Sequence, residues 1–311
     1  MRILFTGASS FTGVWFVREL ARAGHDVVAT FRRKPEDYPD ALRRERVRLA
    51  VQSCRPVFGA SFGDEAFLEL AGQGGFDLLA HHAADVTNYK SPDFDVCGAL
   101  AANTRNLGPI LRVLHAGGCR RVLLTGTFFE GGEGAGSQGL PDFSAYGLSK
   151  ALTAQLFRYI CARAGMGLGK FVVPNPFGPW EEPRFTAYLI KSWFAGQTPS
   201  CATPLYVRDN IHVSLLARAY AQFAAEVPAS GMVKRNPSGY PETQGAFTLR
   251  FAAEMRGRLE LPCPVELKKQ VDFPEPRVRI NTEVLDAAAL GWDEAEAWDE
   301  LAAYYRRAAG K

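Results

Sequence analysis

Short apolar runs alternate with amphipathic stretches over the first half of the chain. Runs rich in Val, Leu and Phe predict buried strands of a parallel sheet at residues 2–5, 25–31, 46–51, 76–82, 121–125 and 169–173. Between these runs, apolar positions recur with the helical period and predict helices at residues 11–23, 64–71, 96–116 and 145–164. This order predicts an α/β fold, a Rossmann-type doubly wound parallel sheet with right-handed crossovers.

The pattern changes after residue 173. Prolines become frequent, the apolar segments shorten, and helices are predicted at residues 186–195, 212–225 and 246–259. We therefore predict a first domain at residues 1–173 and a smaller lobe at residues 174–311, with some segments of the lobe returning to the first domain. The glycine-rich stretch at residues 130–139 predicts a surface loop.

The first turn of the chain has the features of a dinucleotide-binding site. A buried strand runs into a turn of small residues, and an amphipathic helix follows. The helix N-terminus presents free N–H groups and a positive dipole end, which suit a pyrophosphate. The residues expected to bind it are Gly7, Ser9, Ser10, Phe11 and Gly13. Ser10 stands where a glycine is usual, so it either moves the phosphate outward or donates its hydroxyl to it. The alternative interpretation is a tight turn with no ligand.

The end of the second predicted strand indicates which dinucleotide binds. An NAD site places a carboxylate there to hold the ribose 2′-hydroxyl. Here Phe31 occupies that place, and Arg32, Arg33 and Lys34 follow it. Arginine suits a 2′-phosphate, so we predict NADP, with NAD as the alternative and a solvated basic loop as the non-functional interpretation.

Composition excludes several other classes of protein. The net charge is +3 over 311 residues, too small and too dispersed to indicate a nucleic-acid partner. No apolar run reaches the length of about 18 residues that would predict a membrane span. Met1 leads directly into the first strand, which leaves no room for a signal peptide. The 6 cysteines form no CxxC pair and the 5 histidines no ligand spacing, so we expect no metal and a reduced, cytoplasmic protein.

The candidate catalytic groups are Tyr146 and Lys150. They lie four residues apart, so on a helix they share a face. A lysine ammonium lowers the pKa of a nearby phenol, which then exchanges a proton with a carbinol or carbonyl while hydride moves to or from nicotinamide. Thr127 follows a predicted strand and offers a second hydrogen bond to the same substrate oxygen. Asn103 lies in the preceding helix, where its amide would hold a relay water. The alternative for the Tyr–Lys motif is an exposed helical pair.

With these residues in place, the chain resembles an extended short-chain dehydrogenase/reductase of the NAD(P)-dependent epimerase/dehydratase group, which acts on nucleotide sugars. The resemblance covers nearly the whole chain. It rests on TGASSFTG (6–13), DLLAHHAA (77–84), Asn103, TGT (125–127), YGLSK (146–150), PNPFGP (174–179), VRDNIHV (207–213) and LGW (290–292).

The resemblance implies a role for each matching residue. Thr127, Tyr146 and Lys150 correspond to the catalytic Ser/Thr-Tyr-Lys triad, and Asn103 to its supporting asparagine. The resemblance adds Asn103, Tyr146 and Lys150 to the cofactor contacts, together with Ala83, Ala84, Thr125 and Pro174. The residues implied to bind a nucleotide-diphosphate sugar are Thr127, Asn175 and Arg208. Two phosphates suit a bidentate cation, although Arg208 has a structural ion pair with Asp209 as its alternative.

Departures from the family pattern narrow the reaction. In 4,6-dehydratases acidic residues follow the catalytic threonine, whereas Phe128 and Phe129 follow Thr127 here, and Glu130 comes one position late beside two glycines. The cysteine of the 3,5-epimerase pattern is missing as well. Two reactions remain: a 4-ketoreductase that consumes NADPH, and a 4-epimerase that retains its cofactor. Arg32 and Arg33 favour the reductase.

Two further expectations concern class and assembly. The alternative to an enzyme is a protein that binds NADP and senses redox state without catalysis. Such relatives typically lose the tyrosine or lysine that this chain keeps. The family commonly dimerises through the helices predicted at 96–116 and 145–164, so we expect a homodimer. The apolar residues offered for that contact are Leu100, Leu107, Leu111, Leu114, Leu152, Leu156 and Tyr159.

Overall fold

The computed structural model describes residues 1–137 and 139–310 of the chain. They form two compact units, and three segments make up each one. The first unit comprises Met1–Glu133, Leu140–Val173 and Ala217–Asn236. The second comprises Gly134–Gly139, Pro174–Leu216 and Pro237–Lys311.

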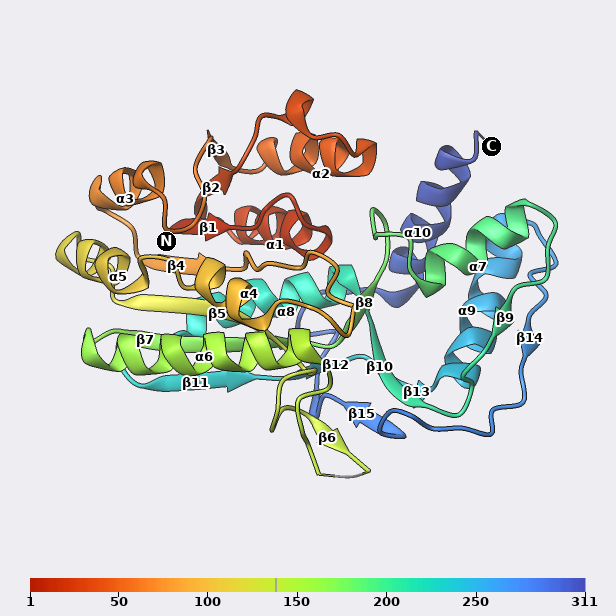
Figure 1. Cartoon of the computed structure of the whole chain (residues 1–311). Helices are drawn as coiled ribbons and strands as arrows, with labels where there is room; N and C mark the ends of the chain where they lie inside the picture. Colours follow the sequence, from red (N-terminus) through yellow and green to blue (C-terminus); the bar gives the residue numbers. More distant parts are fainter. Residues whose placement is uncertain (138, 311) are drawn as a thin grey trace. The chain divides into compact units, whose positions relative to one another are not determined.

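A 7-stranded parallel sheet forms the centre of the first unit, in the order β11-β7-β5-β4-β1-β2-β3 (Figure 1). Its strands are β1 (Arg2–Thr6), β2 (Asp26–Phe31), β3 (Arg55–Phe58), β4 (Leu78–His81), β5 (Arg121–Thr127), β7 (Gly167–Val173) and β11 (Met232–Arg235). The chain builds outward from β1 in one direction to β3 and in the other to β11. The strand order therefore reverses between β1 and β4, and this confirms the doubly wound sheet and marks the point where such folds bind ligands.

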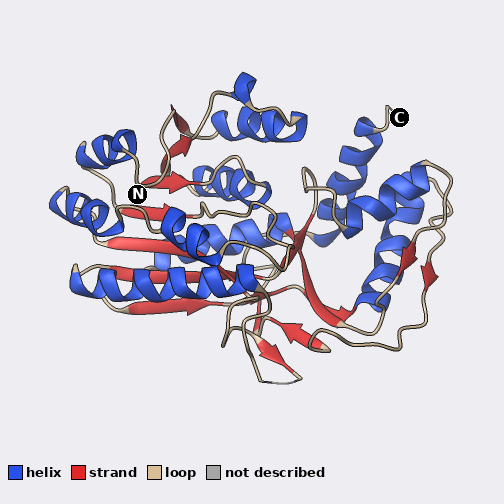
Figure 2. Ribbon diagram, in the orientation of Figure 1, coloured by secondary structure: helices blue, strands red, loops and turns tan. Residues whose placement is uncertain are grey.

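Helices cover both faces of this sheet (Figure 2). The helices are α1 (Phe11–Arg22), α2 (Ala41–Val51), α3 (Glu65–Gly72), α4 (Val96–Asn103), α5 (Leu107–Ala116), α6 (Ala145–Arg163) and most of α8 (Val213–Glu226). On one face, residues of α3, α5 and α6 share a core with Leu79 and Val122 of the sheet. On the other, the rings of Phe16 in α1 and Tyr220 in α8 stack at 3.9 Å. The side chains that pack on both faces are mostly apolar, as is usual for a doubly covered parallel sheet.

The strand predicted at residues 46–51 was wrong. These residues belong to α2, which begins after Asp40, whose carboxylate accepts hydrogen bonds from the N–H groups of Leu42 and Arg43. The third strand is β3, a few residues later. A short apolar run fits a strand and a buried helix equally well, and here the capping residue decides between them.

The single helix predicted at residues 96–116 was also wrong, because it is two helices. Asn106 interrupts it with a φ of 52°, in the left-handed region. Its side chain donates a hydrogen bond to the Gly63 carbonyl at 2.7 Å. Asparagine tolerates this conformation better than most residues, so α4 ends at Asn103 and α5 starts at Leu107.

The stretch at residues 130–139 is not simply a surface loop. Glu130 has no exposed surface and Glu133 is buried. Ala135–Gly136 forms strand β6, which pairs with β15 of the second unit. Gln138 lies outside the described residues. The two carboxylates turn inward because the buried Lys170 of the first unit holds both, as described below.

The second unit has a mixed sheet in which β10 (Val207–His212) pairs with three strands. Those partners are β8 (Asn175–Phe177), β13 (Tyr240–Thr243) and β15 (Val278–Ile280). Short strands complete the unit: β9 (Ser200–Cys201), β12 (Pro237–Ser238), β14 (Glu266–Leu267) and β16 (Glu283–Val284). Its helices are α7 (Phe185–Phe194), α9 (Gln244–Leu259) and α10 (Glu294–Ala308). The sequence predicted α7, α8 and α9 closely but neither α10 nor this sheet. Phe177, Phe251 and Trp298 pack at the centre of its core.

Glu181 is a buried carboxyl group in the second unit. It accepts hydrogen bonds from the Thr186 hydroxyl at 2.7 Å and the Tyr305 hydroxyl at 2.9 Å. Burial raises its pKa to about 7 from an ordinary value of 4.5, although both hydrogen bonds oppose the shift. The folded state therefore binds the proton more tightly than the unfolded state, and stability falls as the pH rises between these two values.

We predict that Glu181→Gln makes the protein more stable than the parent at about pH 8, and that this advantage shrinks towards about pH 5. The glutamine keeps an acceptor and removes a charge that burial penalises, at no more than about 1.4 kcal/mol per pH unit. Thermal unfolding at both pH values measures the effect. Glu266→Gln, at an exposed carboxylate of the same unit, is the control. An unchanged pH dependence in Glu181→Gln would contradict the prediction.

Candidate active site

Two glycines shape the turn between β1 and α1 at the carboxyl edge of the sheet. Gly7 has a φ of +85°, and a Cβ there would lie 2.7 Å from the backbone nitrogen of Ala83. A Cβ on Gly13 would clash with the Gly7 carbonyl oxygen. The turn therefore packs directly on the backbone that follows β4, where the Ala83 N–H donates to the Thr6 hydroxyl at 3.1 Å. Larger residues at either glycine would open this turn.

Ser10 caps α1 rather than standing free for a ligand. Its hydroxyl accepts from the Gly13 N–H at 3.0 Å and donates to the Gly7 carbonyl at 2.9 Å. No acidic residue lies in the first turn of α1. The helix N-terminus keeps its positive end without a competing carboxylate, and it fits an anion such as a pyrophosphate. Ser9 belongs to the same turn, and Phe11 begins the helix with its side chain buried.

His82 links this turn to β5, and sequence reasoning missed it. Its Nε2 lies 3.1 Å from the Ser10 hydroxyl and 3.0 Å from the Thr12 hydroxyl, and its Nδ1 lies 3.0 Å from the Thr125 hydroxyl. Burial lowers the pKa of His82 to about 3, and the charge of Lys150 adds to the shift. The imidazole is therefore neutral and joins three segments. The only signal in the sequence was a second histidine at the end of an apolar run.

Tyr146 lies in the first turn of α6. The Ser144 hydroxyl caps this helix by accepting the Gly147 N–H at 3.1 Å. The Tyr146 ring meets those of Tyr89 and Phe94 edge-on, with centroids 5.5 and 6.0 Å away. Both partners come from the segment between β4 and α4, so α6 and that segment together fix the direction of the phenol.

Lys150, one turn further along α6, is buried against β5. Its Nζ donates a hydrogen bond to the Thr125 carbonyl at 2.7 Å. Burial lowers the pKa of Lys150 to about 8; Glu130 opposes this shift and Lys170 adds to it. A buried lysine with a lowered pKa on the helix that carries Tyr146 has the features of a catalytic pair.

Thr127 and Asn103 lie on neighbouring elements of the same unit. Thr127 ends β5 with 8% of its surface exposed, and its hydroxyl accepts the Phe129 N–H at 3.4 Å. Asn103 ends α4; its Oδ1 accepts the Asp85 N–H at 2.8 Å and its Nδ2 donates to the Thr153 hydroxyl at 3.4 Å. Asn103 thus ties the backbone that follows Ala84 to α6.

Glu130 does not point to solvent. Its Oε1 accepts the Thr127 N–H at 2.7 Å, and its Oε2 pairs with Lys170 Nζ at 2.5 Å. The expected loop is present, with Gly131 and Gly132 exposed, but Glu130 itself turns inward and is fully buried. Glu130 is held in place and has no freedom to swing towards another oxygen.

Arg32 and Arg33 follow β2 at the same carboxyl edge, and both are exposed. Arg33 Nη1 donates to the Asp37 carbonyl at 3.5 Å. Phe31 before them is buried, so no carboxylate stands at the end of β2. Two exposed guanidinium groups at this place suit a phosphate on the ribose.

The remaining predicted residues, Pro174, Asn175 and Arg208, belong to the second unit. Arg208 is buried; its Nη2 pairs with Glu275 at 2.8 Å, and its Nη1 donates to the Pro276 carbonyl at 3.0 Å. The partner is therefore Glu275 and not Asp209, whose carboxylate accepts backbone N–H groups instead. Asn175 stands on β8 opposite Asn210 of β10.

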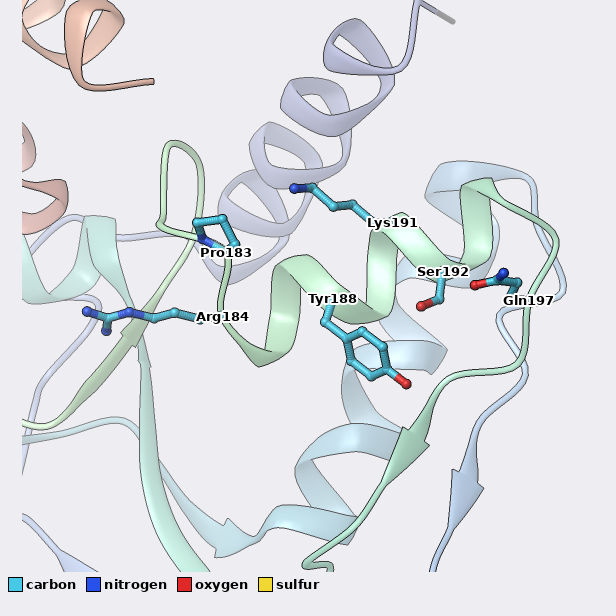
Figure 3. Close-up of a pocket in the computed structure, with 6 residues that line it drawn as sticks. All are labelled: Pro183, Arg184, Tyr188, Lys191, Ser192 and Gln197. Atoms are coloured by element: carbon cyan, nitrogen blue, oxygen red, sulfur yellow. The ribbon is translucent and has the colours of Figure 1, made fainter. Parts of the chain in front are cut away.

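A cavity of about 330 Å³ lies beside α7 in the second unit, lined by Pro183, Arg184, Tyr188, Lys191, Ser192 and Gln197. Figure 3 shows that its polar side chains do not converge: Arg184 extends to one side of the helix and Tyr188 to another. We assign no chemistry to it. Within residues 1–137 and 139–310, no cluster of His, Cys, Asp or Glu has the arrangement of a metal site.

Neither a disulfide nor a membrane-spanning helix is found among the described residues. The 6 cysteines carry free thiols. In the part of the chain that the structure describes, every helix is too short or too polar to span a lipid bilayer.

The family model that matches residues 3–233 is that of the NAD dependent epimerase/dehydratase family. No curated protein matches the chain. Among solved structures, a UDP-glucose 4-epimerase from Thermotoga maritima with UDP-glucose is 17% identical, with a TM-score of 0.73 and 99% of each chain covered.

Two other solved structures share the fold. A dTDP-glucose 4,6-dehydratase from Streptomyces venezuelae with NAD bound is 20% identical, with a TM-score of 0.71 over 100% of this chain and 98% of that one. A UDP-N-acetylglucosamine 4-epimerase from Methanobrevibacter ruminantium is 17% identical, with a TM-score of 0.72 over 99% and 98%.

We predict that replacing Arg32 and Arg33 by alanine weakens NADP binding more than NAD binding. Only NADP carries the 2′-phosphate, and a charge-assisted contact contributes about 1.5–3 kcal/mol, so its Kd should rise roughly tenfold or more. Titration with each reduced cofactor, followed by fluorescence, measures both constants. Arg120→Ala, exposed before β5, is the matched control. Equal weakening of the two cofactors would contradict the assignment.

Proposed function

The chain belongs to the NAD dependent epimerase/dehydratase family, and we propose that it is an NADP(H)-dependent oxidoreductase that reduces the C4 carbonyl of a nucleotide-linked keto-sugar. One observation carries the proposal. Lys150 is buried against the Thr125 carbonyl, one helical turn from Tyr146, beside the turn that fits a pyrophosphate. Such a pair serves proton transfer at a carbonyl oxygen.

Three residues of the first unit have defined parts in the proposed reaction. Tyr146 donates its hydroxyl proton to the C4 oxygen, and the Lys150 ammonium favours the phenolate that results. Thr127 donates a second hydrogen bond to the oxygen as it gains charge. A nicotinamide cofactor, when bound, supplies the hydride to C4.

The residues of the first unit fit a dinucleotide. The Gly7–Gly13 turn and the N-terminus of α1 suit the pyrophosphate, and Arg32 and Arg33 suit the 2′-phosphate of NADP. We also place Ala83, Ala84, Asn103 and Thr125 of the first unit near the cofactor, together with Pro174 of the second. Several solved relatives hold NAD, so the arginines alone support NADP here.

We place a nucleotide-diphosphate sugar with Asn175 and Arg208 in the second unit. Arg208 suits a diphosphate because its guanidinium is planar and already oriented by backbone carbonyls and by Glu275. Glu275 is 49% exposed, so the outer side of this ion pair meets solvent. Relatives solved with UDP-glucose support this substrate class.

The second candidate function is 4-epimerisation with a retained cofactor. It uses the same three groups at C4, and solved 4-epimerases share the fold. A 4,6-dehydratase is less well supported, because the acid nearest Thr127 is Glu130, which Lys170 and the Thr127 N–H already hold. A sensor without catalysis is not favoured by a chain with both Tyr146 and Lys150.

Two assays separate these functions. Purified protein given NADPH and a nucleotide-linked 4-keto sugar should oxidise NADPH in proportion to the sugar reduced. The same protein given UDP-glucose and no added cofactor should form no 4-epimer. The reverse pair of results would establish the epimerase. Mass spectrometry of small molecules released on denaturation shows whether a cofactor is retained. NADPH binding without turnover of any keto-sugar would indicate a sensor.

We predict that Tyr146→Phe lowers turnover by about 10²–10⁴-fold and leaves NADPH affinity close to that of the parent. The substitution keeps the ring that contacts Tyr89 and Phe94 and removes only the hydroxyl. Lys150→Met should harm both turnover and NADPH binding, because it removes a charge that serves both. Keto-sugar reduction by Tyr146→Phe at the parental rate would overturn the assignment of the acid.

We also propose a homodimer formed through α4 and α6. Leu107, Leu111 and Leu114 belong to the protomer's own core, so they are excluded from the contact. Leu100, Leu152 and Leu156 are half-buried, and Tyr159 is 61% exposed. The mass in solution should be twice 34.1 kDa, and Tyr159→Asp should halve it, whereas Tyr188→Asp on α7 should not. A monomer at about micromolar concentration would exclude the dimer, since a C2 interface of standard size holds at that concentration.

A further inference from the structure

A chain of alternating charges runs in the first unit from the carboxyl end of β5, past the middle of β7, to β11. Lys170 of β7 is its centre: its Nζ lies 2.5 Å from Glu130 Oε2 and 2.7 Å from Glu133 Oε1. Lys234 of β11 pairs with the other oxygen of Glu133 at 2.9 Å. Glu130 and Lys170 are the buried end of the chain, and Lys234, 43% exposed, is its outer end.

The buried end meets the backbone of the candidate site. Glu130 Oε1 accepts the N–H of Thr127 at 2.7 Å. A Cβ on Gly126 would lie 2.7 Å from Glu130 Oε1 and 2.7 Å from Lys170 Cε. The strand therefore carries a glycine at the one place where the ion pair crosses it. Any other residue there would push the pair away from Thr127.

Lys150 binds the same three-residue stretch of β5. Its Nζ donates to the carbonyl of Thr125, while Glu130 accepts from the N–H of Thr127. Gly126 separates the two contacts. The backbone from Thr125 to Thr127 is thus held by one charged side chain at each end.

We propose that Glu130 and Lys170 are positioning residues: Glu130 fixes the backbone of Thr127 by accepting its N–H, and Lys170 holds Glu130 in place. This inference rests on the proposed function for its catalytic consequence, but the positioning itself is a property of the protein without substrate. Neither residue transfers a proton in the reaction.

The charged and titratable groups around Lys150 come from four elements. They are Tyr146 on its own helix, His81 and His82 at the end of β4, Glu130 after β5, and Lys170 on β7. Burial lowers the pKa of both histidines to about 3, so they stay neutral at the pH of any assay. The pKa of Lys150 is lowered to about 8 chiefly by burial; Glu130 raises it and Lys170 lowers it further.

The two substitutions should therefore move Lys150 in opposite directions. Glu130→Gln removes the negative charge and should lower the pKa of Lys150. Lys170→Met removes the positive charge and should raise it. The double variant should return it towards the parental value and, because both charges leave together, it is the variant expected to retain stability. These opposite shifts report the charges alone; the positioning is read from the backbone amide signal of Thr127, which should move in Glu130→Gln and in Lys170→Met and stay in place in Lys234→Met.

Nitrogen NMR of the lysine side chains tests this without any substrate. The ¹⁵Nζ signal of Lys150, assigned by its loss in Lys150→Met, is followed against pH in the parent and the three variants. Lys234→Met removes a lysine from the outer end of the same chain and is the matched control, with no shift expected. A Thr127 amide signal that keeps its parental position in both single variants would overturn the proposal. If Glu130→Gln does not fold, Lys170→Met and the double variant decide.

Kinetics with NADPH and a nucleotide-linked 4-keto sugar test the catalytic consequence. Glu130→Gln should lower kcat by about 10- to 100-fold, the loss typical of a misplaced catalytic group, with KM for the sugar changed little. The apparent pKa of Lys150 in the pH profile of kcat should move in the same direction as its pKa in the NMR titration. A parent without reductase activity would refute the proposed function alone, because the Thr127 amide signal, recorded without substrate, still decides the positioning.

Discussion

An ammonium group removed from water needs a partner, and Lys150 finds one in the carbonyl of Thr125. This single hydrogen bond joins the start of α6 to the end of β5, the two elements that carry Tyr146 and Thr127. Because Tyr146 is one helical turn from Lys150, the bond also sets the height of the phenol relative to the sheet edge. A shift of α6 by one turn would break this bond and carry Tyr146 and Lys150 together away from Thr127.

The glycine-rich turn depends on the same edge. His82 connects the cap of α1 to the Thr125 hydroxyl, so the residue whose carbonyl receives Lys150 also receives the imidazole that supports Ser10. Thr125 of β5 therefore contacts both Lys150 and the imidazole that supports the N-terminus of α1. Such shared support keeps a cofactor site and a proton-transfer site in register. The imidazole in it is neutral, because burial lowers the pKa of His82 to about 3.

Local patterns predicted much of this arrangement and none of its long-range pairs. Spacing within one turn or one helix was enough to predict Gly7, Gly13, Tyr146 and Lys150. The alternation of apolar runs predicted the parallel sheet. Glu130 does not, because two glycines beside it suggest a loop while its partner, Lys170, lies 40 residues away. The same limit explains the strand predicted at 46–51, where a cap at Asp40 decides for a helix. Whether the predicted cofactor and substrate residues perform their roles is a question for the assays above.

Stability alone gives no reason for the charge chain of Glu130, Lys170 and Glu133. Removing such groups from water costs several kcal/mol for each ion, and apolar residues of the same volume often fill such a site equally well. Apolar residues cannot, however, accept a hydrogen bond from a particular backbone N–H. Glu130 places a fixed acceptor under the N–H of Thr127, and Lys170 supplies the buried countercharge that holds this carboxylate in place. The chain of charges therefore makes sense as the support of one backbone group at the end of β5, and Lys234 brings the far end of that support to the solvent.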